Sequence, residues 1–261
     1  MPRHNLPMRI TVQLHPQHAE YSDIREAVTR AEAIGADTVY NWDHFYPLYG
    51  EPEGKHFEAW TMQAAWAEQT STIDVGCLVT CNSYRNPELL ADMARTVDHI
   101  SGGRLVFGIG SGWFEKDYEE YGYEFGTAGS RLDHLAEALP RIVARWEKLN
   151  PAPTRRIPIL IGGSGEKKTL KMVAQYADIW HSFIRIDEPE LFEHKKSVLQ
   201  KWCDEVGRDF DEIDISVGGQ GLTPEHGDEL VERGVGELTI GLNGPDYDMA
   251  EVEAWVAWRD R

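Results

Sequence analysis

Short apolar runs alternate with segments of helical periodicity along this chain, and this alternation constrains its fold more than any other feature. Eight runs rich in apolar and β-branched residues are typical of buried strands, at residues 9–14, 38–42, 74–80, 104–109, 157–161, 178–183, 212–217 and 236–242. The segments that follow them carry apolar residues at helical spacing, at residues 24–34, 57–71, 87–100, 132–149, 166–177, 189–206, 224–234 and 247–260. The pattern therefore predicts a regular succession of strands and helices.

This succession favours one α/β domain over residues 1–261, folded as a (β/α)8 TIM barrel, rather than a doubly wound sheet. Strands that are almost continuously apolar are typical of a parallel sheet covered by helices, and eight strand–helix units in 261 residues match a barrel. Active sites of such barrels lie where the strands end. Polar residues and glycines gather after the predicted strands, at His15, Asp43-His44, Thr80-Cys81-Asn82, Gly110–Gly112, Gly162–Gly165, His181-Ser182, Gly218-Gly219 and Asn243. We therefore expect one functional rim.

Charge and cysteine content narrow the class of protein. The chain has 44 Asp+Glu against 26 Lys+Arg, a formal net charge of −18. Nucleic acids and anionic membranes are therefore unexpected partners, because both bind basic surfaces. Three cysteines are too few for a disulfide framework, and no run reaches the ~18 apolar residues of a membrane span. Because residues 1–5 also lack the apolar region of a secretory signal, we expect a cytoplasmic protein. With nucleic acids and membranes unexpected, the partner we expect is a small-molecule substrate.

The pair Asp43-His44 directly follows the second predicted strand. A histidine exchanges protons near neutral pH, and a neighbouring carboxylate can orient the N–H or O–H groups of a ligand. The alternative is a surface pair that caps a loop. The position at a strand end favours a functional role.

Two glycine-rich segments also follow strands. Gly108–Gly112 has the spacing G-x-G-x-G, and we expect the acidic, aromatic segment 114–118 behind it to be a loop, so it does not match a dinucleotide fingerprint. We expect these glycines to admit a flat ring, or alternatively to form a barrel corner. Gly162–Gly165, followed by Lys167-Lys168, is expected to bind an anion at a helix N-terminus, or alternatively to form a simple turn.

The remaining candidates concern aromatic, metal-binding and thiol groups. Aromatic residues concentrate in segments 45–49 and 113–125, which suits a lid or a planar ligand, the alternative being packing on the outer helices. His15 and His18 lack a third ligand, so no metal site is expected. We interpret Cys77 as a core thiol and Cys81 as a loop thiol.

Several segments resemble the bacterial luciferase-like monooxygenase superfamily. They are Trp42–Phe45, Thr80, Tyr84–Pro87, Ser101–Leu105, Gly108–Phe114, Tyr118, Tyr121-Gly122 and Pro158–Gly163. Within the superfamily, the sequence Asp-His-Phe at residues 43–45 most resembles the branch that uses the deazaflavin coenzyme F420. The resemblance covers residues 9–183 well, and the rest only through its strand–helix rhythm.

The resemblance implies a deazaflavin or flavin ring at the carboxyl ends of the barrel strands, with His44 as the catalytic proton donor or acceptor. It also implies a non-prolyl cis peptide around Cys77-Leu78 and a cofactor phosphate at the 162–165 turn. The expected cofactor-binding residues are Asp43, Cys77, Thr80, Asn82, Ser111, Gly112, Gly162, Gly163, Ser164 and Gly165. The expected substrate or lid residues are Phe45, Tyr46 and Trp113.

We therefore expect a coenzyme F420-dependent oxidoreductase that transfers a hydride between the deazaflavin and a small organic substrate. Trp113 stands where the sugar-phosphate dehydrogenase branch has a catalytic Glu, and segment 150–156 is short where many relatives carry a substrate-covering insertion. A different substrate and a more open site follow from these departures. The alternatives are a flavin mononucleotide (FMN) monooxygenase served by a separate flavin reductase, and a non-catalytic flavin-binding protein. A homodimer is one assembly that the resemblance implies.

Overall fold

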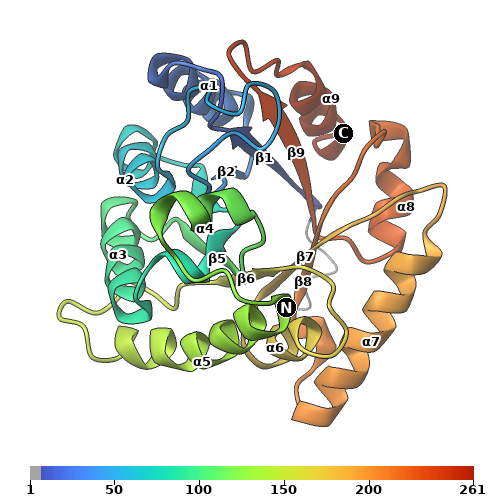
Figure 1. The fold of residues 1–261 in the computed structure, drawn as a ribbon. Coiled ribbons are helices and arrows are strands. Elements are labelled where there is room, and N and C mark those ends of the chain that lie inside the picture. Colours follow the sequence, from blue (N-terminus) through green and yellow to red (C-terminus); the bar gives the residue numbers. More distant parts are fainter. Residues whose placement is uncertain (1–6) are drawn as a thin grey trace.

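A computed structural model describes residues 7–261, which form a closed barrel of parallel strands (Figure 1). The strands are β1 (Arg9–His15), β2 (Thr38–Asn41), β3 (Asp74–Cys77), β4 (Thr80–Cys81), β5 (Leu105–Gly110), β6 (Ile159–Gly162), β7 (Ile179–Phe183), β8 (Asp214–Gly218) and β9 (Glu237–Asn243). Their order is β3-β2-β1-β9-β8-β7-β6-β5-β4, and β3 also pairs with β5. Because β3 and β4 both pair with β5, they share one place in the ring, and the barrel has eight places. The predicted TIM barrel is confirmed.

The helices, apart from the short one at Glu115–Tyr121, surround the barrel and cover its outer face (Figure 1). They are α1 (Tyr21–Ile34), α2 (Ala59–Gln69), α3 (Pro87–Ile100), α4 (Glu115–Tyr121), α5 (Ala128–Trp146), α6 (Thr169–Tyr176), α7 (Glu190–Val206), α8 (Gly227–Glu232) and α9 (Ala250–Arg259). Short 3-10 turns occupy Asn82–Tyr84, Phe210–Glu212 and Pro224–His226. The apolar faces of the helices pack against the outer side of the sheet to form the main core. No helix in the described part of the chain is long and apolar enough to cross a membrane.

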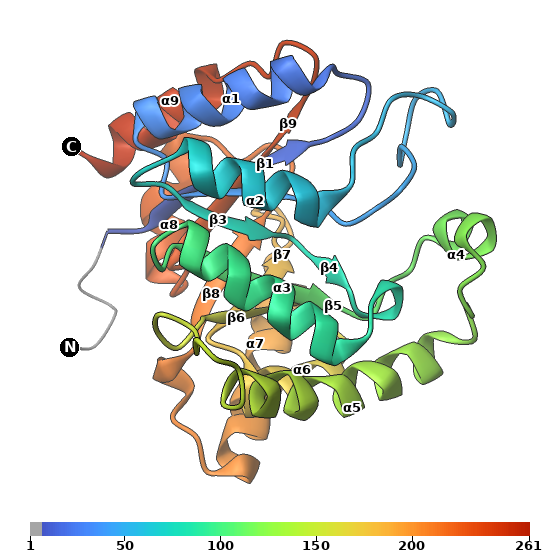
Figure 2. The same ribbon diagram turned by 90° about the vertical axis from the view of Figure 1, so that its left-hand side faces the viewer.

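Helix α4 corrects the expectation that segment 114–118 is a loop. It stands outside the ring of helices, beyond the carboxyl ends of β4 and β5 (Figure 2). Asp117 and Tyr118 on this helix are fully buried, and Gly122 ends it in the left-handed conformation. A helix of only seven residues is too short to show a repeating apolar stripe, so periodicity did not reveal it. The buried contacts of Asp117 and Tyr118 and the Gly122 cap stabilise it instead.

The break between β3 and β4 shapes the inside of the barrel. The non-prolyl cis peptide lies at Leu78-Val79, one residue beyond the bond expected from the resemblance. Gln13 on β1 donates a hydrogen bond to the Leu78 carbonyl oxygen at 2.6 Å. A Cβ atom on Gly108 would overlap the Cys77 carbonyl oxygen, and one on Gly110 would lie 2.7 Å from Cγ2 of Val79. Gly108 therefore makes room for β3, as the alternative of a packing role expects, and Gly110 makes room for Val79 in the break while also lining the cavity described below.

Replacement of Gly108 by alanine is predicted to lower the free energy of unfolding by about 3 kcal/mol or more, because rigid backbone occupies the space of the new methyl group. Urea unfolding followed by circular dichroism measures this loss. Gly129→Ala is the matched control. Gly129 lies in helix α5, and its added methyl group would come no closer than 3.6 Å to another atom, which is an ordinary contact distance. The control should be unchanged or more stable by up to about 1 kcal/mol. Equal unfolding midpoints for the two variants would contradict the packing argument.

Candidate functional site

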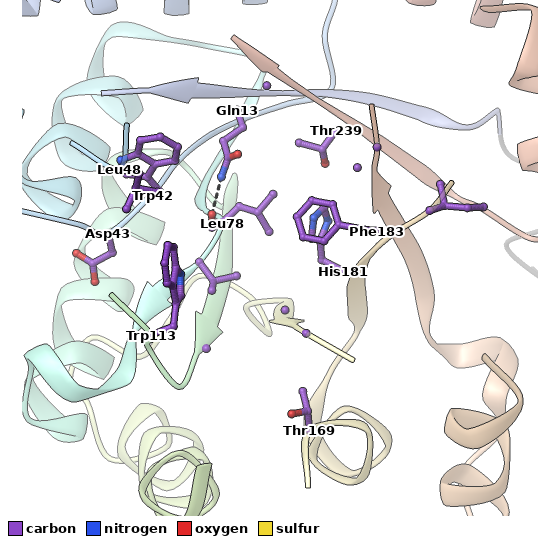
Figure 3. A pocket seen from close by; sticks show the side chains of 18 of the residues that line it. Gln13, Trp42, Asp43, Leu48, Leu78, Trp113, Thr169, His181, Phe183 and Thr239 are labelled. Atoms are coloured by element: carbon purple, nitrogen blue, oxygen red, sulfur yellow. Dashed lines mark hydrogen bonds between the residues drawn. The ribbon is translucent and has the colours of Figure 1, made fainter. Parts of the chain in front are cut away.

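A cavity of about 1550 Å³ opens at the carboxyl ends of the strands (Figure 3). Its floor includes the apolar side chains of Leu78 and Val79, which the break between β3 and β4 turns into the barrel. Three exposed aromatic side chains surround the site: Trp113 and Phe183 line the cavity and are 63% and 77% exposed, and Tyr49 is 47% exposed beside the lining residue His15. The cavity therefore combines an apolar floor with an aromatic mouth, as ligand sites commonly do.

The structure brings part of the predicted site together and leaves part of it outside. The predicted residues that line the cavity are Asp43, His44, Thr80, Ser111, Gly112, Trp113, Gly162 and Gly163. The predicted residues that do not line it are Cys77, Asn82, Ser164, Gly165, Phe45 and Tyr46.

Internal contacts account for the residues outside the cavity. Cys77 is buried on β3, and Asn82 is buried in the 3-10 turn that follows β4. The Ser164 hydroxyl lies 2.8 Å from that of Ser182, behind the turn. Phe45 stacks on Tyr121 with 3.9 Å between ring centroids.

Cys81 also corrects an expectation. It was interpreted as a loop thiol, but it is buried on β4 with its Sγ 3.3 Å from the Tyr118 hydroxyl. Burial raises the pKa of this thiol to about 11, so it is protonated at neutral pH. Cys81 is therefore a packing residue of the cavity wall.

Asp43 lies at the edge of the cavity and points away from its centre (Figure 3). Its carboxylate is 1% exposed and accepts two hydrogen bonds from Arg85, at 2.6 and 3.0 Å, and one from the Cys81 amide at 2.9 Å. Burial by itself lowers the pKa of the Arg85 guanidinium, but the neighbouring carboxylates of Asp43 and Glu58 raise it by more, so the net effect is a raised pKa. The carboxylate is thus engaged within the protein, and Arg85 is a member of the site to which sequence reasoning gave no role.

His44 is held by a second buried carboxylate. Its Nδ1 lies 2.8 Å from Oδ2 of Asp117, which also accepts a hydrogen bond from the Tyr84 hydroxyl at 2.9 Å. Oδ1 of Asp117 accepts from the Phe45 amide at 3.1 Å. A carboxylate in this position fixes the proton on Nδ1, so Nε2 is the nitrogen of His44 left for a ligand in the cavity.

Asp117 and Tyr84 were not predicted as site residues. Tyr84 lies in a segment that carries the family resemblance, but Asp117 lies in segment 114–118, for which the sequence predicts a loop. It is 73 positions from His44, and no pattern in the sequence joins the two.

Several aromatic side chains of segment 113–125 pack inside the protein, and one lies at the cavity mouth. Tyr118, Tyr123 and Phe125 pack with Tyr84 in a small cluster under α4. Trp113 lies instead at the cavity, 5.6 Å from the His44 ring. Of this segment, Trp113 is therefore the aromatic side chain in a position to touch a ligand.

The 162–165 turn retains features of an anion site. Gly163 is in the left-handed region at φ 113°, and Thr169 at the start of α6 lines the cavity beside it. Within the described part of the chain, no backbone hydrogen bond engages the amides of Ser164, Gly165 and Glu166. Lys168, however, turns to Asp133 on α5 at 2.6 Å. The turn therefore offers amides rather than lysine side chains.

Positive charge is scarce in the cavity. Among the described residues that line it, Arg185 is the one lysine or arginine, and it pairs with Asp187 at 2.8 Å and with Glu188 at 3.4 Å. Burial lowers the pKa of the lining residue His15, which disfavours a positive charge on this imidazole. Apart from the backbone amides of the 162–165 turn, the described lining therefore offers little positive charge to an anionic group.

A family model described as luciferase-like monooxygenase matches residues 4–254, so the chain belongs to this family. The F420-dependent glucose-6-phosphate dehydrogenase of Amycolatopsis mediterranei (strain U-32) is 29% identical over 176 residues, which cover 59% of this chain and half of that protein. An F420-dependent secondary alcohol dehydrogenase, solved with an F420–acetone adduct, superposes with a TM-score of 0.82 at 17% identity and covers 97% of this chain and 98% of its own. The oxygenating constituent of 3,6-diketocamphane monooxygenase from Pseudomonas putida was solved with FMN. It superposes with a TM-score of 0.61 at 18% identity and covers 88% of this chain and 72% of its own. The two solved structures share the fold.

Replacement of Arg85 by alanine is predicted to lower the free energy of unfolding by about 3–5 kcal/mol, because it leaves the buried Asp43 carboxylate without its cation. Chemical unfolding at neutral pH measures the change. Arg141→Ala is the control, since Arg141 pairs with Glu88 on the exposed surface of the helices. Its loss should be much smaller. A similar loss in both variants would show that the Asp43–Arg85 pair has no special weight.

Proposed function

We propose that this chain is a coenzyme F420-dependent oxidoreductase that acts on a small, uncharged organic substrate. The observation that carries the proposal is the His44–Asp117 pair, in which a histidine held by a buried carboxylate presents its second nitrogen to an apolar cavity. This is the arrangement of a general acid–base group.

The cavity fits a flat cofactor with a phosphate. Leu78, Val79 and Trp113 offer apolar and aromatic surface to a ring. Ser164 and Gly165, next to the lining residue Gly163, have amides without a backbone hydrogen bond, which supports their assignment as donors to the phosphate. A deazaflavin or flavin bound there supplies the hydride-transfer chemistry. The protein supplies the binding, the orientation and, at Nε2 of His44, the lone pair that accepts a proton from the substrate and can later return it.

The extent of the structural matches supports the deazaflavin over FMN. The alcohol dehydrogenase is matched over 98% of its length, whereas the FMN-bound monooxygenase is matched over 72% and carries additional segments that this chain lacks. The connection between α5 and β6, at residues 147–158, runs at the amino ends of the strands, where Arg155 donates a hydrogen bond to the Leu105 carbonyl oxygen at the start of β5. It does not line the cavity, so the expectation of a more open site does not follow from its short length.

Two features of the cavity support an uncharged substrate rather than a sugar phosphate. Arg185 is neutralised by Asp187, and no other lysine or arginine among the described lining residues can meet a phosphate there. Trp113 replaces a potential acidic base with an apolar ring at the mouth. The activity of the glucose-6-phosphate dehydrogenase relative therefore does not transfer, and small ketones, enones, imines and alcohols are the substrates to screen.

Titration of the purified protein with coenzyme F420 and, separately, with FMN is predicted to give tight binding of F420 and weak binding of FMN. Fluorescence of each cofactor measures its dissociation constant. The opposite preference would move the protein to the FMN monooxygenases, which need a reductase partner. Tight binding of a cofactor without turnover across a broad substrate panel would favour a non-catalytic flavin-binding protein.

The Asp117→Asn variant is predicted to lose about 10²–10⁴-fold in kcat for F420-coupled turnover while its F420 dissociation constant stays within about threefold. The amide group of asparagine can donate to Nδ1 of His44, which moves the imidazole proton to Nε2 and reverses its role in the cavity. Stopped-flow absorbance of the deazaflavin measures the rate.

Tyr84→Phe is the control for this variant, because it removes one hydrogen bond to Asp117 and keeps the carboxylate beside His44. It should lose less than about tenfold in kcat. If both variants lose the same factor, Asp117 serves the packing of α4 and not the tautomer of His44.

A further inference from the structure

A second histidine faces the cavity from the wall opposite His44. In the eight-place ring, β2 and β7 are separated by β1, β9 and β8 on one side and therefore lie across the barrel from each other. His44 follows β2, and His181 lies on β7 with its side chain in the middle of the cavity (Figure 3). A ligand between the two walls lies between the two rings.

A buried hydrogen-bond chain sets the tautomer of His181. The Ser216 hydroxyl donates to Oε1 of Glu237 at 2.8 Å, and Nδ1 of His181 lies 2.9 Å from the same hydroxyl oxygen. Since the proton of Ser216 is used toward Glu237, Nδ1 of His181 must be the donor in the second bond. Nε2 of His181 then carries a lone pair and no proton.

Glu237 anchors this chain independently of the cavity. Its Oε1 also accepts from the Tyr40 hydroxyl at 3.3 Å, and its Oε2 lies 3.7 Å from the guanidinium of Arg9. Arg9 is at the opposite end of the barrel, where it also pairs with Asp74 at 3.3 Å. The orientation of His181 therefore exists before any ligand binds.

His181 is also uncharged at neutral pH. It is 7% exposed, and burial lowers its pKa to about 4. Its ring meets the edge of Phe183 at 5.6 Å. Nε2 is consequently a neutral hydrogen-bond acceptor in apolar surroundings, where an unmatched polar group is costly.

We propose that His181 recognises an uncharged O–H or N–H donor of the bound molecule through Nε2, with Ser216 and Glu237 as positioning residues. This inference rests on the proposed function only in that the cavity binds a ligand. Two sources carry such a donor: the imide N–H of a deazaflavin or flavin ring, and the hydroxyl or N–H group of a substrate. A group that only accepts hydrogen bonds, such as a carboxylate or an ether oxygen, is not recognised by this nitrogen.

Nitrogen-15 NMR of the histidine-labelled protein tests the tautomer without any ligand or activity. We expect the proton of His181 on Nδ1 in the unsubstituted protein and in Glu237→Gln, whose amide oxygen still accepts from Ser216. Ser216→Ala should lose the preference for Nδ1. Thr11→Val is the control, since Thr11 pairs with Thr239 inside the barrel and does not touch His181. A proton on Nε2 in the unsubstituted protein overturns the proposal.

Binding probes then separate the two sources of the donor. Cyclohexanol and its methyl ether, methoxycyclohexane, are titrated into the protein with and without F420, and F420 is titrated into His181→Leu and His181→Gln. A Nε2 chemical shift that moves with cyclohexanol and not with the ether assigns the donor to the substrate. F420 binding that is about tenfold weaker in both variants assigns it to the cofactor.

The proposal is overturned if Nε2 of His181 is unprotonated but neither result is observed, that is, if cyclohexanol does not shift the Nε2 signal and F420 binds both variants as tightly as the unsubstituted protein. If F420 fails to bind the unsubstituted protein, the proposed function fails, while the tautomer and the cyclohexanol shift still decide the role of His181.

Discussion

The contact between β5 and the break after β3 determines the geometry of the whole cavity. Gly108 leaves room for the Cys77 carbonyl and Gly110 for Val79, so that the chain can turn Leu78 and Val79 into the barrel. The strand then resumes at β4, where the Cys81 amide binds the Asp43 carboxylate. Without two residues lacking a side chain on β5, the floor and the rim could not both form.

Buried carboxylates organise the rim from this base. Asp43 forms a buried ion pair with Arg85, and this pair connects the loop after β2 to the segment before α3. Asp117 reaches the same loop from α4 and orients His44. Glu237 orients His181 on the opposite wall through Ser216. In each case the acid pairs with a neighbouring side chain, and two of these acids orient an imidazole that faces the cavity.

The strand–helix rhythm was sufficient to predict the barrel, the rim and the positions of Asp43 and His44. It did not reveal α4, because a short helix depends on tertiary contacts and a cap. Cys77 and Asn82 were expected at the cofactor and are buried outside the cavity lining. Ser164 and Gly165 do not line the cavity with their side chains, and only their backbone amides remain candidates for the phosphate. Position at a strand end says that a residue is near the rim. It does not say toward which side its group points, since neighbouring side chains alternate between the two faces of the sheet.

The sequence by itself determined the fold and the rim, because buried strands and amphipathic helices are periodic patterns that a linear chain displays. Only the tertiary structure decided which partner each functional group has. His44 meets an acid 73 positions away, and His181 is joined to Glu237 through a serine 35 positions further along the chain. Hydrogen bonds act over about 3 Å in space, and barrel closure, not sequence spacing, brings these groups within that distance.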